Sequence, residues 1–133
     1  MILFNLETTL ILGYLFYILV ILVHILILKK IIPFHLVNGG RSETYEKQSS
    51  ISKNSIFISC IGILFLSILL VKPSYQKTLS YSIIAFVLTA YWMLGFVMQL
   101  LGTKFERYLM SLLVLLGVLS HLSLALLRYS EAS

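Results

Sequence analysis

The chain has 133 residues, of which 59% are hydrophobic and only 11% are charged, and its formal net charge is +5. A soluble domain uses about 25% charged residues to cover its surface, so this composition excludes an ordinary soluble protein and indicates one that faces lipid. The basic residues lie mostly beside apolar segments, where they suit anionic lipid head groups, and no further pattern indicates nucleic-acid binding.

Four apolar segments without charged residues follow one another along the chain, at about 8–28, 54–71, 79–102 and 108–127. A helix needs about 20 apolar residues to cross a bilayer, and only helices and closed barrels satisfy their backbone hydrogen bonds in lipid. The segments lack the alternating pattern of barrel strands. The sequence therefore predicts an all-α protein, with residues 1–133 forming a single transmembrane domain built as a four-helix bundle.

The first segment is expected to stay in the mature protein. Glu7 stands where a signal peptide has a basic region, and no small-residue cleavage site follows the apolar run. The second and third connections are short, which makes neighbouring helices antiparallel.

The long connection at 29–53, called loop one below, contains most of the turn residues. Pro33 disfavours helical geometry in the residue before it and is expected to end the first helix. Asn38–Gly40 accept the positive φ of a tight turn. The N–H groups of this turn, with Arg41 beside them, suit a nest for a lipid phosphate or a carboxylate, although a simple reversal of the chain explains them as well. Residues 42–54 are polar enough for a short surface helix.

Lysine and arginine residues are distributed unevenly among the loops. Loop one has five, the next two loops have two each, the C-terminal tail has one and the N-terminus has none. Loops one and three lie on the same side and hold seven of these ten residues. The positive-inside rule therefore places these two loops in the cytoplasm and both termini outside.

Several polar residues fall at the cytoplasmic ends of the predicted helices. His24 lies shortly before the end of the first segment, and Gln99 lies near the end of the third. The second segment opens with Asn54, Ser55 and Ser59. Together they predict a polar layer beneath loop one, with Glu106 and Arg107 at its edge. One interpretation is a ligand cavity around His24, and the other is a clasp of hydrogen bonds between helices.

His121 lies deeper, toward the outer end of the fourth segment. Ser67 and Ser123 are candidate hydrogen-bond partners because they fall at a similar depth. A histidine with hydroxyl neighbours is expected here to be a packing residue rather than a proton relay.

Patterns of catalytic residues are absent from the sequence. The chain has no aspartate, and of its five glutamates only Glu43 and Glu46 are close together. No nucleophile elbow, phosphate loop or zinc-protease helix occurs, and the three histidines are dispersed without metal-ligand spacing. We therefore expect no metal and no cofactor, while an enzyme with few catalytic groups remains an alternative.

Two short motifs resemble a group of small, uncharacterised bacterial four-span membrane proteins. These proteins carry an Ile-Pro-aromatic step and then Gly-Gly-Arg after the first span, matched here by Ile32–Phe34 and Gly39–Arg41. They also carry a Phe-Glu-basic step before the fourth span, matched by Phe105–Arg107. The tryptophan that often precedes their glycines is replaced by Asn38. The resemblance implies a four-span fold in a bacterial inner membrane and implies no activity.

A second resemblance, in topology, is to the membrane-associated eicosanoid and glutathione transferases. These enzymes bind glutathione with arginines, a glutamate and an asparagine around the start of the second span. Only Glu46 and Asn54 match that set here, and Lys47 and Lys53 stand nearest to the missing arginines.

The sequence thus predicts a polytopic membrane protein that acts by association, either with itself or with another membrane protein or component. The alternatives are a small membrane enzyme similar to the glutathione transferases and a small transporter. The candidate site for a ligand, a partner or a lipid head group consists of the polar residues at the loop-one end: His24, Arg41, Glu43, Glu46, Asn54, Gln99, Glu106 and Arg107.

Overall fold

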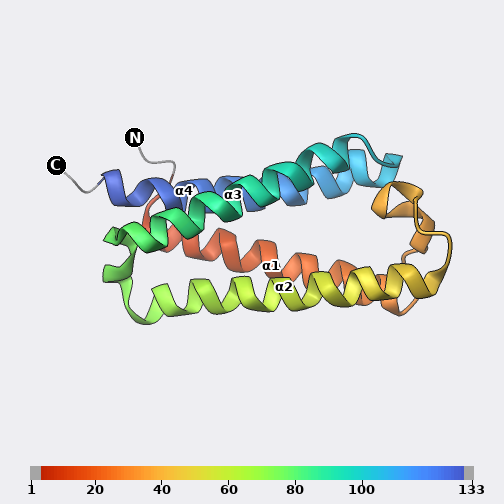
Figure 1. Cartoon of the computed structure of the whole chain (residues 1–133), viewed down its shortest axis with the longest axis horizontal. Coiled ribbons are helices and arrows are strands. Elements are labelled where there is room, and N and C mark those ends of the chain that lie inside the picture. Colours follow the sequence, from red (N-terminus) through yellow and green to blue (C-terminus); the bar gives the residue numbers. More distant parts are fainter. Residues whose placement is uncertain (1–3, 131–133) are drawn as a thin grey trace.

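The computed structural model describes residues 4–130, which form four antiparallel helices without any strand (Figure 1). The helices are α1 (Leu6–Leu28), α2 (Tyr45–Val71), α3 (Leu79–Leu100) and α4 (Ser111–Ser130). A π-helical turn, Glu106–Met110, leads directly into α4. All four helices are long and apolar enough to span a membrane. The predicted all-α membrane bundle is confirmed, and the protein is an integral membrane protein.

Three of the helices begin at a side chain that caps the free N–H groups of the first turn. Asn5, Thr44 and Thr78 each accept a hydrogen bond from the backbone N–H three residues further on, at 2.7–3.4 Å. Such caps stabilise a helix by about 1 kcal/mol each. The chain therefore marks the beginning of each of these helices locally, before any tertiary packing.

Helix α2 extends beyond the predicted apolar segment. It begins at Tyr45, so residues 45–53, assigned above to loop one, form its first turns. The surface helix expected at 42–54 is therefore continuous with the second span rather than separate. The reason is that the Thr44 cap starts a helix, and neither glycine nor proline interrupts the chain before the apolar run.

The end of α1 agrees with the predicted apolar segment, but the residue that stops the helix differs from the expected Pro33. The helix ends at Leu28, earlier than Pro33 requires, because Lys30 adopts a left-handed conformation with φ of 62°. The Ile31 N–H then bonds back to the Leu26 carbonyl at 2.9 Å. This is a Schellman motif, which commonly precedes a proline by a few residues.

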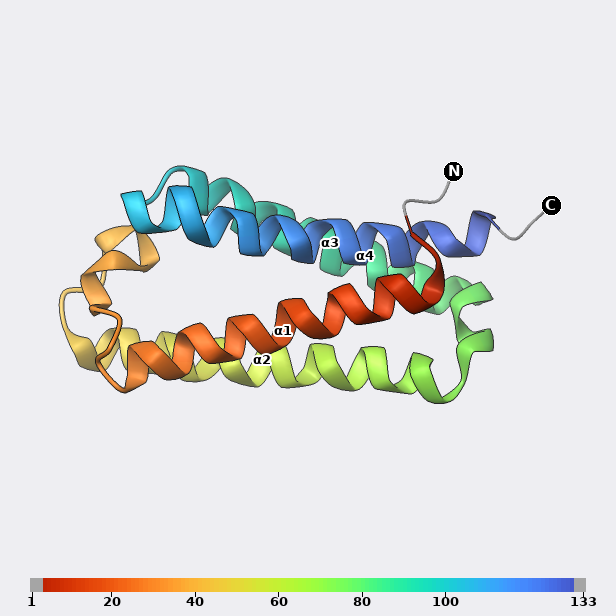
Figure 2. The same cartoon turned by 180° about the vertical axis from the view of Figure 1, so that it is seen from behind.

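The four helices pack unevenly around the bundle. Helix α1 packs against α2 and α4, and α3 packs against α4. Helices α2 and α3 meet near the end of the bundle at which α1 begins and α4 ends, called the terminal end below. There the Phe65 and Tyr81 rings stack with centroids 4.7 Å apart. From there the two helices diverge toward loop one (Figures 1 and 2). The bundle is therefore closed at the terminal end and open between α2 and α3 at the loop-one end.

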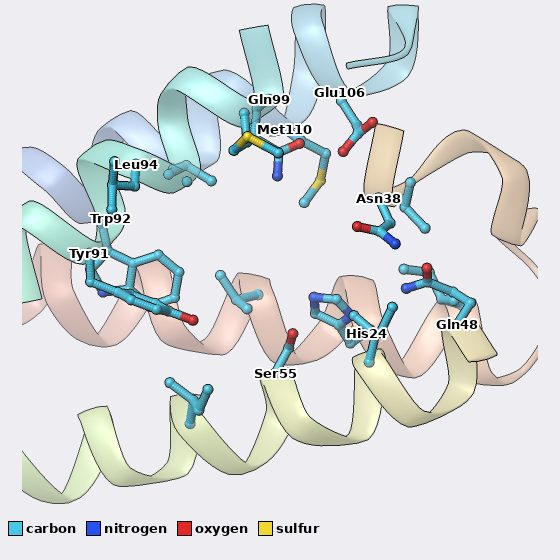
Figure 3. A pocket seen from close by; sticks show the side chains of 18 of the residues that line it. His24, Asn38, Gln48, Ser55, Tyr91, Trp92, Leu94, Gln99, Glu106 and Met110 are labelled. Atoms are coloured by element: carbon cyan, nitrogen blue, oxygen red, sulfur yellow. The ribbon is translucent and has the colours of Figure 1, made fainter. Parts of the chain in front are cut away.

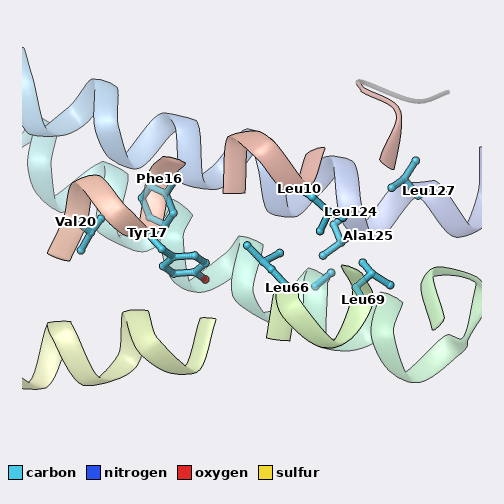
Figure 4. Packing of buried hydrophobic residues seen from close by; sticks show 10 residues of the cluster. Leu10, Phe16, Tyr17, Val20, Leu66, Leu69, Leu124, Ala125 and Leu127 are labelled. Carbon is cyan, nitrogen blue, oxygen red and sulfur yellow. The ribbon is translucent and has the colours of Figure 1, made fainter. Parts of the chain in front are cut away.

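The buried apolar core lies in the closed half of the bundle (Figure 4). It consists of Leu10, Phe16, Tyr17, Val20, Leu66, Leu69, Ala85, Leu124, Ala125 and Leu127. Two of its aromatic rings pack against glycines of neighbouring helices. A Cβ at Gly62 would lie 2.5 Å from Tyr17 Cε1, and one at Gly117 would lie 2.5 Å from Phe16 Cζ. These glycines let the large rings of α1 approach the backbones of α2 and α4.

Candidate ligand-binding cavity

A cavity of about 350 Å³ lies between the four helices at the open end of the bundle, where loop one covers it (Figure 3). Its lining residues are Val20, His24 and Ile27 of α1; Val37, Asn38 and Arg41 of loop one; Gln48, Ile51, Ser55 and Ile58 of α2; Tyr91, Trp92, Leu94, Gly95, Met98 and Gln99 of α3; and Glu106, Met110 and Val114 of the fourth helix. Polar groups gather toward loop one, and aromatic and aliphatic groups lie further in.

A continuous chain of hydrogen bonds forms the α2 side of the polar end. Asn38 Nδ2 donates to Ser42 Oγ at 3.2 Å, and the Ser42 hydroxyl donates to Gln48 Oε1 at 2.9 Å. Gln48 Nε2 donates to Ser52 Oγ at 3.1 Å, and Ser52 Oγ lies 2.9 Å from His24 Nδ1. Gln48 and Ser52 are buried. The chain joins loop one, α2 and α1, so it fixes the shape of this wall.

The direction of these hydrogen bonds determines which nitrogen of the His24 ring carries the proton. Each hydroxyl has one proton to donate, and the Ser52 proton finds its acceptor when it points at His24 Nδ1. The ring proton then lies on Nε2, for which the described residues provide no partner. Figure 3 shows the His24 ring at the edge of the cavity, with one nitrogen facing its interior. His24 therefore offers a hydrogen-bond donor to whatever enters.

Glu106 fastens loop one to the fourth helix. Its side chain is only 3% exposed, and its Oε1 accepts hydrogen bonds from Gly39 N at 2.8 Å and Thr103 N at 3.1 Å. The residues Asn38, Gly39 and Gly40 all have positive φ, between 54° and 72°. Within the turn, only the Gly39 N–H binds this carboxylate. The N–H groups of Gly40 and Arg41 bond to the Val37 and Asn38 carbonyls, so they do not form the nest for an external anion that the sequence suggested.

Thr103 completes this attachment from the third connection. Its Oγ1 accepts a hydrogen bond from Glu106 N at 3.3 Å, so the two residues cap each other reciprocally at the start of the fourth helix. The Thr103 hydroxyl in turn donates to the Leu36 carbonyl of loop one at 2.5 Å. Two bonds thus hold loop one over the end of the bundle, and the positive end of the helix favours the Glu106 carboxylate.

Two other polar residues of the cavity lining have groups without strong partners. Gln99 Oε1 is buried and accepts no hydrogen bond from the described residues. Arg41 is exposed at the mouth, and Nη2 donates only a long bond of 3.4 Å to Asn38 Oδ1. A guest in the cavity therefore finds donors at Arg41, whereas the buried Gln99 oxygen is not accessible to it.

A buried cluster of side chains that links α1, α3 and α4 lies at the inner end of the cavity. Trp92 Nε1 donates to the Tyr17 hydroxyl at 3.4 Å, and that hydroxyl lies 2.7 Å from His121 Nε2. His121 Nδ1 lies 2.7 Å from the Gly117 carbonyl, which can only accept, so Nδ1 carries the proton and Nε2 accepts from Tyr17. His121 is therefore buried with both ring nitrogens hydrogen-bonded.

The two serines considered as partners of His121 bond elsewhere. The Ser67 hydroxyl lies 2.8 Å from the Tyr14 hydroxyl, and Ser123 Oγ lies 2.9 Å from Thr9 Oγ1. Depth in the membrane alone was therefore too coarse a guide to the contacts of His121.

Four of the eight candidate site residues line the cavity together: His24, Arg41, Gln99 and Glu106. The other four, Glu43, Glu46, Asn54 and Arg107, are exposed and do not line it. Asn54 is excluded because each residue turns a helix by about 100°, so it faces away from the side on which Ser52 and Ser55 lie. Glu43 instead pairs with Lys47 at 3.4 Å on the surface.

The sequence contained two signals for the residues that were missed. The missed residues Gln48 and Ser52 recur with Ser55 and Ser59, which were already expected in the polar layer, at steps of four, three and four. This spacing places all four on one face of a helix. Thr103 and Glu106 stand in the T-x-x-E spacing of a capping box. Trp92 and Tyr91 carried no such signal, because aromatic residues are common in membrane spans.

No family model, curated protein or solved structure matches the chain. Among residues 4–130, no three histidine, cysteine or acidic side chains lie close enough together to hold a metal ion. The function must therefore be argued from the cavity itself.

Proposed function

We propose that this protein is a non-enzymatic membrane protein of the bacterial inner membrane, and that it acts by association with another membrane component held in the cavity. The observation that carries this proposal is the composition of the cavity, which is polar beneath loop one and mostly apolar along α3 from Tyr91 to Met98. A molecule with a polar head and an apolar body matches both regions. The bacterial membrane rests on the resemblance of Ile32–Phe34 and Gly39–Arg41 to small bacterial four-span proteins.

The open side of the bundle supports entry from the bilayer. The α3 wall includes Tyr91, Leu94 and Met98, whose side chains are 47%, 69% and 45% exposed. Because α2 and α3 diverge here, a membrane-dissolved molecule reaches the cavity sideways without crossing water. Pockets of about 300–1,000 Å³ are typical of small-molecule sites, and this cavity is at the lower end of that range.

The arrangement gives less support to a glutathione transferase. Glu46 and Asn54, the two residues that match the glutathione site of those enzymes, are exposed and lie outside the cavity. The cavity also lacks a cluster of arginines, since Arg41 is the only arginine or lysine among its lining residues.

Photo-crosslinking in native membranes tests the proposal. A benzophenone amino acid replaces Leu94 on the cavity wall, and in a matched control it replaces Ile11, which is similarly exposed (59%) and does not line the cavity. We expect an adduct of one defined mass at Leu94 and only diffuse lipid labelling at Ile11. The mass of the adduct identifies the occupant as a lipid, a second protein or another copy of this chain. Equal labelling at the two positions, or none at Leu94, contradicts the proposal.

A further inference from the structure

We infer that the cavity selects the head group of a zwitterionic phospholipid with a primary amine, its ammonium against Glu106 and its phosphate toward Arg41. This inference rests on the proposed function and names the class of the bound membrane component. It follows from the charges, the hydrogen-bonding groups and the open side of the cavity.

The carboxylate of Glu106 is the first part of the argument. It is almost completely buried, and the described residues pair it with no cation. Both N–H groups that it binds lie on Oε1, and Figure 3 shows one carboxylate oxygen directed into the cavity. A buried charge is costly unless it is paired and hydrogen-bonded. A primary ammonium supplies both the opposite charge and three N–H donors.

Arg41 provides the second charge, at the mouth. Its guanidinium lies against Gly39, with Nη1 3.0 Å from the position that a Cβ would take there. The Gly39 N–H binds Glu106 on the inside, so the two opposite charges flank the same turn. Arginine binds phosphate with strong, charge-assisted hydrogen bonds. A purely anionic head group at Arg41 would bring its negative charge close to the Glu106 carboxylate. A purely cationic head group at Glu106 would bring its positive charge close to the Arg41 guanidinium. Both kinds of lipid are therefore disfavoured.

The remaining groups fit the rest of such a lipid. His24 offers a hydrogen-bond donor further inside the cavity, where the ester oxygens and the glycerol region of a phospholipid would lie. Beyond them the lining becomes aromatic and aliphatic at Tyr91 and Trp92. The acyl chains leave between α2 and α3 and stay in the bilayer, so the cavity needs to hold only the head group and the glycerol region.

Native mass spectrometry of the delipidated protein in detergent tests this inference. The probes are phosphatidylethanolamine, its mono- and dimethylated forms, phosphatidylcholine and phosphatidylglycerol, all with the same acyl chains. We expect the unmethylated amine lipid to bind about tenfold more tightly than phosphatidylcholine and phosphatidylglycerol, with a stepwise loss as each N–H donor is methylated. This series uses only the wild-type protein, so it does not depend on the folding of a variant.

Charge variants locate the effect. Glu106→Gln keeps an oxygen for the Gly39 and Thr103 N–H groups but removes the charge, and we expect it to abolish the preference for the amine. Arg41→Gln should weaken phosphatidylethanolamine and phosphatidylcholine alike, because both carry the phosphate. Arg107→Gln is the control, since Arg107 is exposed and does not line the cavity.

Three results would overturn the inference: equal binding of all the lipids, tightest binding of phosphatidylglycerol, or an unchanged amine preference in Glu106→Gln. If crosslinking at Leu94 succeeds while the lipids bind without preference, only the head-group inference fails. If Leu94 captures no occupant, the proposed function fails as well.

Discussion

At the scale of single residues, the Tyr17 hydroxyl joins α1 to two other helices in the buried part of the bundle. It accepts a hydrogen bond from Trp92 of α3 and donates one to His121 of α4. Its ring also covers Gly62 of α2. One side chain of α1 therefore contacts all three other helices, in a region where water cannot replace a lost partner.

Removal of this hydroxyl should destabilise the bundle measurably. Tyr17→Phe keeps the ring but leaves the Trp92 N–H and His121 Nε2 without partners, and we expect a loss of about 1–3 kcal/mol in the free energy of unfolding. Trp92 is the only tryptophan, so its fluorescence reports unfolding in mixed detergent micelles. Tyr108→Phe, at a ring that is 69% exposed, serves as the control and should change the stability by less than about 0.5 kcal/mol. If both variants unfold alike, the hydroxyl chain does not stabilise the bundle.

Alanine substitutions at two glycines distinguish the effect of close packing on stability from the effect of helix propensity. Gly62→Ala places a methyl group 2.5 Å from the Tyr17 hydroxyl oxygen, so the ring must shift. We expect a loss of about 1–3 kcal/mol, as in other overpacked cores. Gly95→Ala meets its nearest atom, Val114 Cγ1, at an ordinary 3.6 Å. It should leave the free energy of unfolding unchanged or slightly higher. The same unfolding assay checks both, and a stable Gly62→Ala variant would show that Tyr17 has room to move.

At the scale of the elements, loop one depends on the start of the fourth helix. Glu106→Ala removes the acceptor for Gly39 N and half of the reciprocal cap with Thr103. We expect loop one to open more often, and trypsin to cleave after the exposed Arg41 several-fold faster in detergent. Glu106→Gln retains the accepting oxygen and should be cleaved nearly as slowly as the wild type. Equal cleavage of all three proteins would show that Glu106 does not hold the loop.

The elements also show which parts of the fold could be predicted from the sequence. The four spans follow from uninterrupted apolar runs, since bilayer thickness imposes their length. The rotation of each helix about its own axis could not be predicted in the same way, because spans that are apolar on all sides have no polar face. Asn54 was therefore expected in the cavity, whereas Gln48 and Ser52 occupy that wall. Only the spacing of polar residues along α2 carried this information.

The same reasoning explains the prediction of the site. His24, Gln99 and Glu106 were grouped correctly because their depth in the membrane can be counted from the ends of the spans. The contact between Tyr17 and His121 joins residues 104 positions apart in the chain. It depends on how α1 and α4 face each other, which only the packed bundle defines.

At the scale of the whole molecule, the bundle has two distinct ends. Helix α1 begins and α4 ends at the closed end, while loop one and the third connection lie together at the open end (Figure 2). Loops one and three hold seven of the ten basic residues. The positive-inside rule therefore predicts that the cavity faces the cytoplasmic leaflet and that both termini lie outside.

Cysteine labelling in intact cells tests this orientation. Cys60 is the only cysteine and is exposed on α2, so Cys60→Ser provides the background. Glu43→Cys reports on the loop-one end and Ser74→Cys on the opposite end, and both positions are exposed. A membrane-impermeant maleimide should label position 74 in intact cells and position 43 only after the cells are opened. The reverse pattern would place the cavity in the outer leaflet, and the lipid that it selects would then have to come from that side.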